Sequence, residues 1–324
     1  MVRRRAWLSL GVAAVLALAA GCGGGSEEST SGGGEGKPTT VTVGTLPISN
    51  AAPLYLGAKK GFFREEGIEV KPEVAQSGNE LITGALSGSY GFIFAGYIPS
   101  IVARSKGLPI TIVSASDIGA KTASKEWTVL LVKPESKIRG PDDLVGKTIA
   151  VNGLRGVGEV VIKASLEKQG VDPDRIKLLE VPFPEMPAAL EANRVDAIWA
   201  PEPFLTQVLE DGGRQVDAPL VTIAPNFVNG AYEASEEFIS KNPEVTERFK
   251  RAMDRSVDYA QANPGEVRKL IPTFTKIPPE VADKIRLPVW SSKLDRQQLQ
   301  EAAQYTQRYG IIKEAPDVNE MVYE

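Results

Sequence analysis

The feature that most constrains this chain is an internal repeat of a helix–turn–strand–loop pattern. Residues 85–99 align without gaps on residues 189–203, and each copy carries an apolar run that leads into a loop with proline. In the second copy Pro201 and Pro203 flank Glu202 and restrict how far that residue can move. Two matching units predict two similar lobes, each of which contributes a loop to a shared space. We interpret that space as a cleft for a small molecule.

The composition is that of a soluble globular protein, and it limits which kinds of catalytic and metal site the chain can form. The chain has 324 residues, enough for two domains, with 42% hydrophobic and 24% charged residues. A net charge of −4 argues against nucleic acid as a partner. There is no histidine, and the one cysteine is Cys22. Histidine acid–base catalysis, Ser–His or Cys–His nucleophiles and most transition-metal sites are therefore excluded, and we predict no catalytic residue and no metal.

The N-terminus reads as an export signal that ends at a lipidation site. Three arginines, residues 3–5, precede an apolar run over residues 6–20 that is too short for a comfortable membrane span. Leu18-Ala19-Ala20-Gly21-Cys22 resembles a bacterial lipobox. We therefore expect a signal peptide over 1–21, a lipid on Cys22 and a flexible Gly/Ser/Glu linker over 22–39. The alternative is an ordinary secretory signal with an incidental cysteine. Either way the protein is expected outside the cytoplasm, in the periplasm or on the outer face of the cytoplasmic membrane.

From residue 40 the chain alternates predicted strands and helices, which favours mostly parallel sheets covered on both faces. The expected strands are 41–46, 68–74, 91–94, 110–114, 127–132, 148–151, 176–181, 195–199 and 221–223. Helices are expected at 52–63 and between most strands, and residues 235–310 look largely helical. We infer an α/β fold in which lobe 1 comprises 40–124 and 225–324 and lobe 2 comprises 125–224. The two crossings, near 123–127 and 224–232, would form a two-segment hinge over a cleft.

A glycine-rich turn after the strand 148–151 is the sharpest candidate site. Gly153, Gly156 and Gly158 lead into a predicted helix, whose free N–H groups and positive dipole end can bind an anion. Arg155 could add a charge-assisted hydrogen bond. The spacing matches neither the dinucleotide fingerprint nor a P-loop, so we predict no cofactor. The alternative is a tight strand-to-helix turn with a solvated arginine.

Other candidate contacts follow the carboxyl ends of the predicted strands, where α/β sheets bind ligands. Tyr97 and Trp199 could form aromatic walls, although Trp199 could equally be a core residue. Most of the polar candidates are also ordinary turn formers. The predicted ligand contacts are Ser49, Asn50, Gln76, Ser77, Gly96, Tyr97, Gly153, Arg155, Gly156, Val157, Trp199 and Glu202.

Several segments together resemble one known family of binding proteins. They are residues 61–70, 86–88, 105–109, 144–149 and 195–204. These segments are similar to the nitrate/sulfonate/taurine and thiamine-pyrimidine-precursor family, the substrate-binding proteins of ABC importers. The resemblance covers about residues 40–270 and implies a type II periplasmic-binding-protein fold, solute capture by lobe closure and delivery to a membrane permease. The expected partners are a small-molecule ligand, an ABC permease and, through its lipid, the membrane, and the protein is expected to be a monomer.

The main alternative is an enzyme of the same fold, and the family resemblance implies two kinds of enzyme. One is a pyrimidine synthase that consumes its own active-site histidine, which a chain without histidine cannot be; the other acts in menaquinone precursor synthesis. The lipobox argues against both, so we predict a binding protein and not an enzyme. A carboxylate at Glu202 would repel a plain anion and suit a ligand with N–H donors. Taurine-like sulfonates, aminopyrimidine-like solutes and small aromatic acids with donor groups remain open.

Overall fold

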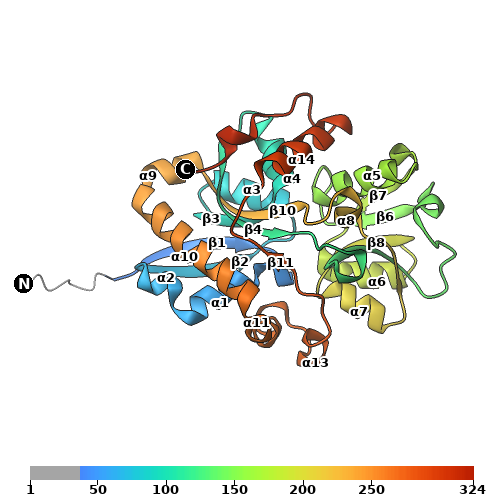
Figure 1. The fold of residues 1–324 in the computed structure, drawn as a ribbon, viewed down its shortest axis with the longest axis horizontal. Helices are drawn as coiled ribbons and strands as arrows, with labels where there is room; N and C mark the ends of the chain where they lie inside the picture. The colour runs from blue at the N-terminus through green and yellow to red at the C-terminus, as the bar shows by residue number, and fades with distance from the viewer. Residues whose placement is uncertain (1–36) are drawn as a thin grey trace, which may run out of the picture. The chain divides into compact units, whose positions relative to one another are not determined.

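The computed structural model describes residues 37–324, and its strands form two separate sheets (Figure 1). The predicted signal peptide, 1–21, and the predicted lipidation site, Cys22, lie outside the described residues. Only residues 37–39 of the predicted linker are described. Within residues 37–324, no helix is long and apolar enough to cross a membrane.

Sheet A has six strands in the order β11-β4-β10-β3-β1-β2. Strand β1 is parallel to β2 and β3, whereas β10 is antiparallel to β3 and β4, and β11 is antiparallel to β4. The strands are β1 (Thr39–Thr45), β2 (Ile68–Val74), β3 (Phe92–Gly96), β4 (Ile110–Ile118), β10 (Val228–Ser235) and β11 (Val289–Trp290). All of them lie before residue 119 or after residue 227.

Sheet B has five strands in the order β7-β6-β8-β5-β9. Strand β6 is parallel to β7 and β8, and β5 is antiparallel to β8 and β9. The strands are β5 (Thr128–Val132), β6 (Thr148–Val151), β7 (Lys177–Glu180), β8 (Ala197–Pro201) and β9 (Arg214–Asp217). Every residue of β5 and β8 is buried, as expected for central strands with helices on both faces.

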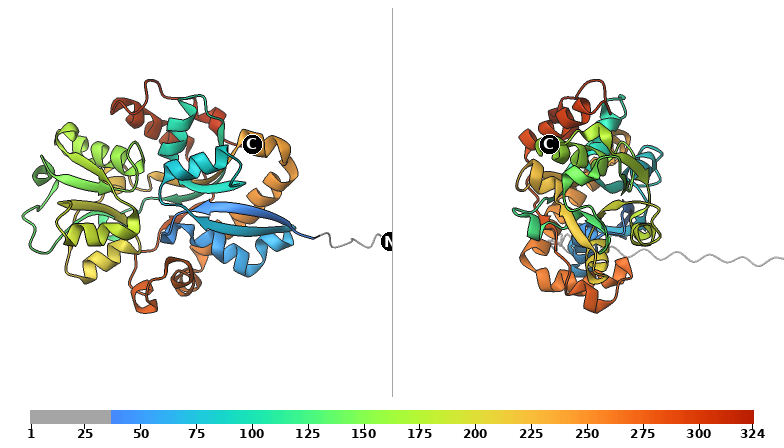
Figure 2. Two further views of the ribbon diagram at one scale, coloured as in Figure 1. Left: turned by 180° about the vertical axis from the view of Figure 1, so that it is seen from behind. Right: turned by 90° about the vertical axis from the view of Figure 1, so that its right-hand side faces the viewer.

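The helices pack on both faces of each sheet (Figures 1 and 2). Around sheet A, α3, α4 and α14 lie on one side, and α1, α2, α10 and α11 lie on the other. Around sheet B, α5 lies opposite α6 and α7. The helices are α1 (Ala52–Lys60), α2 (Phe62–Glu65), α3 (Gly78–Leu86), α4 (Tyr97–Arg104), α5 (Val157–Lys168), α6 (Met186–Glu191), α7 (Phe204–Glu210), α8 (Pro219–Ile223), α9 (Glu236–Lys241), α10 (Pro243–Ala262), α11 (Pro264–Leu270), α12 (Pro272–Thr275), α13 (Pro279–Ala282) and α14 (Arg296–Arg308).

The predicted repeat is confirmed as two similar units. The first consists of α3, β3 and α4, and the second of α6, β8 and α7. In each unit a short turn joins the first helix to a buried strand, and a second helix follows the strand within two residues. The two units lie in different sheets, so each sheet directs one such strand end toward the space between them.

Two expectations about the elements are wrong. Residues 221–223 belong to α8, because Pro219 opens a helix that packs on α5 and this packing overrides the strand preference of β-branched residues. The helix expected over 52–63 breaks at Gly61, whose φ of 85° is left-handed. Residues 235–310 are largely helical, as expected, and contain only the two-residue strand β11. Both sheets are mostly parallel, as expected: only β10 and β11 in sheet A and β5 in sheet B run against the other strands.

Candidate functional site

A cavity lies between the two sheets, beyond the carboxyl ends of their parallel strands. Sheet A contributes residues that end or follow β1, β2 and β3, together with one residue of β10. Sheet B contributes residues that follow β6 and β7 and the end of β8. Its volume is about 50 Å³. A cavity that binds benzene has a volume of roughly 150 Å³, so a ring-sized ligand would have to widen this one. The position follows the general rule for ligand sites in open α/β sheets.

Aromatic rings form much of the cavity wall. Phe94, Trp127, Phe183 and Trp199 line it, and each is buried. The ring centroids of Phe183 and Trp199 are 6.0 Å apart. No charged residue of the described chain lines the cavity, and residues 37–324 contain no group of three His, Cys, Asp or Glu residues that could hold a metal ion. The walls therefore suit a planar or apolar ligand that is oriented by hydrogen bonds.

Trp199 lies in the cavity wall, where the sequence predicted it. Its indole Nε1 is buried and has no hydrogen-bond partner among the described residues. Leaving a buried N–H unpaired costs about 1–3 kcal/mol. Gly158 permits the ring position, because a Cβ at Gly158 would come within 2.8 Å of the indole. Trp199 thus forms part of the apolar wall of the cavity.

The glycine-rich turn after β6 forms the floor of the cavity on the side of sheet B. Gly153, Gly156 and Val157 line the cavity, as predicted. Gly156 is the N-cap residue of α5 and supplies no side-chain cap, so the first N–H groups of the helix have no intrahelical acceptor. A Cβ at Gly156 would come within 2.9 Å of the Gly153 carbonyl oxygen. This turn can therefore receive an acceptor or anionic group of a ligand.

The two sheets approach each other closely at the rim of the cavity. Gly96 ends β3, and a Cβ on it would lie 2.3 Å from Cγ2 of Val157, the first residue of α5. Nearby, Asn79 Nδ2 donates to the carbonyl oxygen of Leu154 at 3.2 Å. These contacts join a strand end of sheet A to a helix start of sheet B. The absence of a side chain at Gly96 is therefore what permits this closed arrangement.

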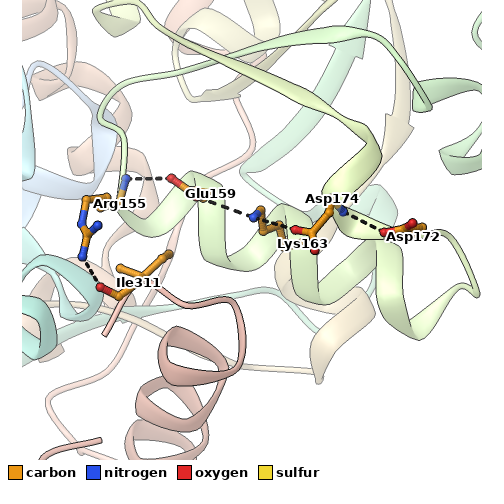
Figure 3. Close-up of polar contacts among 6 residues, drawn as sticks. All are labelled: Arg155, Glu159, Lys163, Asp172, Asp174 and Ile311. Carbon is orange, nitrogen blue, oxygen red and sulfur yellow. Dashed lines mark hydrogen bonds and ion pairs between the residues drawn. The ribbon is translucent and has the colours of Figure 1, made fainter. Parts of the chain in front are cut away.

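Arg155 does not line the cavity, so its predicted contact with a ligand is not supported. Its guanidinium donates to the carbonyl oxygen of Ile311, which follows α14 (Figure 3). Its backbone N–H donates to Glu159 Oε2 at 2.8 Å. The φ of 58° at Arg155 is left-handed. Arg155 instead links the glycine-rich turn of sheet B to the C-terminal segment that packs on sheet A.

Glu202 is fully buried and likewise does not line the cavity. Its carboxylate accepts hydrogen bonds from Thr206 N at 3.1 Å, Thr206 Oγ1 at 2.8 Å and Arg286 N at 2.8 Å. Burial raises the pKa of Glu202 to about 7, although these hydrogen bonds limit the rise. The predicted ligand contact is therefore not supported. Glu202 connects the end of β8 to the C-terminal chain.

Replacing Glu202 by alanine is expected to lower the free energy of unfolding by about 3 kcal/mol. The reason is that buried donors of Thr206 and Arg286 would lose their acceptor. Urea denaturation checks this, with Glu202→Gln as the matched variant that keeps an acceptor and nearly the same shape. If Glu202→Ala were as stable as the wild-type protein but bound the ligand more weakly, Glu202 would be a ligand contact after all.

The other predicted contacts that do not line the cavity lie beside it or on the surface. Ser49 and Asn50 are fully buried, and Ser49 N donates to the Glu202 carbonyl oxygen at 3.0 Å. Ser77 caps α3, and Gln76 is exposed. Tyr97 is buried at the start of α4, and this burial raises its pKa. The predicted contacts that do line the cavity are Gly96, Gly153, Gly156, Val157 and Trp199.

Several residues that line the cavity were not predicted from the sequence. Asn152 and Phe183 follow β6 and β7. The rule that ligands bind beyond the carboxyl ends of strands could therefore have identified both. Trp127 immediately precedes β5 at the first predicted crossing between lobes. Asn229 lies on β10, a strand that was not predicted, and no local pattern marks it.

The comparison with protein families gives one clear match. Residues 48–267 match the family model described as "NMT1/THI5 like". A riboflavin-binding protein, RibY, of Chloroflexus aurantiacus is 26% identical over 85% of the chain, and a formylaminopyrimidine-binding protein of Halalkalibacterium halodurans is 25% identical over 68%. A 4-amino-5-hydroxymethyl-2-methylpyrimidine phosphate synthase of Saccharomyces cerevisiae is 25% identical over 65%. The aligned regions cover 76%, 65% and 64% of these relatives' own lengths.

Solved structures show the same fold. The alkanesulfonate-binding protein SsuA from Xanthomonas axonopodis pv. citri, bound to MOPS, superposes with a TM-score of 0.74 over 89% of this chain and 99% of its own, at 18% identity. The periplasmic nitrate-binding protein NrtA from Synechocystis PCC 6803 gives a TM-score of 0.74 over 88% of this chain and 86% of its own, at 16% identity. The predicted periplasmic-binding-protein fold is therefore confirmed.

Proposed function

The chain belongs to the NMT1/THI5-like family, and we propose that it is an extracytoplasmic solute-binding protein of an ABC importer. It captures a small organic solute between two lobes and delivers the solute to the membrane permease. We propose the lobe boundaries inferred from the sequence, 40–124 with 225–324 and 125–224. The strands of sheet A and sheet B fall within these ranges apart from the first residue of β1, Thr39. The protein acts as a monomer in this proposal.

The observation that carries the proposal is that both sheets line one cavity. Phe94 and Gly96 come from β3 of sheet A, whereas Trp199 comes from β8 of sheet B. A ligand held by both would stabilise the closed arrangement relative to an open one. Relatives that bind formylaminopyrimidine or riboflavin support this reading.

The alternative is an enzyme similar to the pyrimidine phosphate synthases among the relatives. It is less well supported, because the chain has no histidine and its cavity has no charged lining residue of the described chain to act as acid or base. The N-terminus of α5 can hold a ligand but cannot accept or release protons at neutral pH. The cavity therefore favours binding over catalysis.

Among the ligand classes that the sequence leaves open, the cavity favours aminopyrimidine-like solutes over taurine-like sulfonates. Its aromatic rings suit a planar ligand. No charged side chain of the described residues lines the cavity, so none can pair there with an ammonium group or a sulfonate. The N-terminus of α5 supplies a positive dipole end that an acceptor could use.

A binding screen of the purified protein tests the proposed function. Thermal shift is measured with pyrimidines, flavins, alkanesulfonates, taurine, nitrate and small aromatic acids, followed by calorimetry of each hit. A ligand at about a hundred times its Kd stabilises the folded state by about 2.7 kcal/mol, which a thermal shift detects. Stabilisation by one small organic class supports a binding protein. Conversion of such a compound to product by the purified protein would favour the enzyme instead.

We also propose that the protein is anchored through a lipid on Cys22. Replacing Cys22 by serine removes the thiol that carries the lipid, so the protein is expected to move from the membrane fraction to the soluble fraction. Fractionation with an antibody to the chain checks this, and Ser29→Ala in the same segment is the matched control. Membrane retention of Cys22→Ser would refute the anchor and leave an ordinary secretory signal as the explanation.

A further inference from the structure

Two side chains at the ends of α5 contact the C-terminal end of α14, so they join a helix of sheet B to a helix that packs on sheet A. Arg155 lies two residues before α5, and its guanidinium donates to the carbonyl oxygen of Ile311 (Figure 3). Glu167, in the last turn of α5, accepts from the hydroxyl of Tyr309 at 2.7 Å and pairs with Arg308 at 3.1 Å. The two contacts therefore lie at opposite ends of α5.

The sequence at the end of α14 fixes the acceptor that Arg155 uses. Gly310 follows the last turn of the helix and has a left-handed φ of 68°. Its N–H donates to the carbonyl oxygen of Gln307 at 2.9 Å, and the N–H of Ile311 donates to that of Thr306 at 3.1 Å. This pair of bonds is the Schellman motif with which glycine commonly ends a helix. Because Ile311 is also buried, its carbonyl group is held in place independently of Arg155.

The side chains and backbone that meet at these contacts are also held by their own neighbours. The backbone N–H of Arg155 donates to Glu159 Oε2 at 2.8 Å, and Glu159 lies 3.8 Å from Lys163 Nζ, one turn further along α5 (Figure 3). On α14, the ring of Tyr309 stacks on that of Tyr305, with centroids 6.3 Å apart. Ordering both partners beforehand lowers the conformational entropy that a contact must offset.

The protonation states of Glu167 and Tyr309 suit a strong hydrogen bond. The hydrogen bond from Tyr309 lowers the pKa of Glu167, so the carboxylate is ionised at neutral pH. Burial raises the pKa of the Tyr309 phenol, and the same hydrogen bond raises it further, so the phenol remains a donor. A charge-assisted bond of this kind is stronger than one between neutral groups. The ion pair with Arg308 adds little, because both of its side chains are exposed to solvent.

The contact at Arg155 moves with the glycine-rich turn of the cavity. Gly156 and Val157, which directly follow Arg155, both line the cavity. Separating the two sheets at this point would therefore carry Arg155 away from the carbonyl oxygen of Ile311. Neither Arg155 nor Glu167 lines the cavity itself, so both contacts are compatible with the cavity being filled or empty.

We propose that Arg155 and Glu167 form a clasp on residues 308–311 that stabilises the closed arrangement of the two sheets without touching the solute. The inference rests on the proposed function and concerns the regulation of that same site. Because the clasp favours closure before a solute binds, it reduces the free energy that the solute must supply to close the cleft. It is thereby expected to slow the release of any solute that the cavity holds.

The test measures the distance between the two sheets with no solute added. Spin labels are attached at Ser87→Cys, at the end of α3, and Glu191→Cys, at the end of α6, in the full-length protein with Cys22→Ser. Double electron–electron resonance then gives the distribution of label distances. Combining Arg155→Ala with Tyr309→Phe removes a hydrogen bond at each end of α5. The ratio of closed to open molecules is expected to fall at least about tenfold, which is the effect of one net hydrogen bond.

Further variants separate the clasp from a general effect of the substitutions. Arg251→Ala breaks an exposed pair with Glu66 whose two members both lie on the side of sheet A, and it is expected to leave the distances unchanged. In a Glu167→Ala background, Tyr309→Phe is expected to have no further effect, because its acceptor is already absent. Melting temperatures check that each variant folds, and Tyr309→Phe alone, the mildest change, is expected to shift the ratio about threefold.

Two results would overturn the inference. One is an equal distribution of distances in the wild-type protein and in the folded variant with both substitutions, and the other is a further shift caused by Tyr309→Phe when Glu167→Ala is already in place. Because no solute is present, either result leaves the proposed binding function standing. Conversely, failure of every solute in the wider screen would refute the binding function and leave the measured clasp intact.

Discussion

Replacing Gly96 by valine is expected to weaken ligand binding by at least about a hundredfold while the protein still folds. A Cβ at Gly96 would lie 2.3 Å from Cγ2 of Val157, which is far inside van der Waals contact. Gly96 ends β3 of sheet A, and Val157 begins α5, the helix that follows β6 of sheet B, so the clash is relieved most easily by moving the two sheets apart. A ligand that contacts both sheets would then lose one wall, and a hundredfold loss corresponds to about 2.7 kcal/mol.

Calorimetry with a ligand identified by the screen, together with small-angle X-ray scattering, measures this effect. The variant is expected to keep a larger radius of gyration than the wild-type protein when the ligand is present. Adding Val157→Ala to Gly96→Val removes the clashing methyl groups and is expected to restore much of the affinity, as coupled neighbours should. Gly140→Val is the matched control, because its Cβ would meet nothing within 4 Å. Normal affinity and normal compaction in Gly96→Val would contradict the role given to this contact.

Replacing Glu233 by glutamine is expected to stabilise the protein by about 2 kcal/mol at pH 8 and by much less at pH 5. Glu233 is fully buried on β10, Ser100 Oγ donates to its Oε2, and its Oε1 has no partner in the described residues. Burial raises the pKa of Glu233 from 4.5 to about 8. Glutamine keeps the shape and an acceptor for Ser100 but can never become charged.

The sign follows from proton binding. Between pH 4.5 and about 8 the folded protein holds a proton on Glu233 that the unfolded chain has released, so folding stability falls as the pH rises through this window. The wild-type protein is therefore expected to be less stable at pH 8 than at pH 5, and Glu233→Gln is expected to reduce that slope. Urea denaturation at both pH values measures it. Glu237→Gln, an exposed residue paired with Lys241, is the control, and an equal slope in wild type and Glu233→Gln would show that Glu233 is not the group responsible.

The sequence alone predicted the α/β fold and placed its candidate site beyond the strand ends. The repeat of residues 85–99 at 189–203 is visible without any structure, because side-chain period and turn residues are local properties. The rule that ligands lie beyond strand ends then led to Gly96, Gly153, Gly156, Val157 and Trp199, which all line the cavity. These positions depend on where a strand stops, and a few neighbouring residues decide that.

Only the tertiary structure decided what the charged and amide side chains do. Glu202 is held by Arg286, Arg155 bonds to Ile311, and Asn229 is tied to Asp117, pairs that lie 84, 156 and 112 residues apart in the chain. A local pattern places a side chain on a loop or strand, but it does not show which distant donor or acceptor will take up its hydrogen-bonding capacity. In a buried environment that partner is decisive, because an unpaired polar group is costly. The carboxylate expected to recognise the ligand thus became a support of the C-terminal chain, and the position of Asn229 became evident only once β10 was seen to return between β3 and β4.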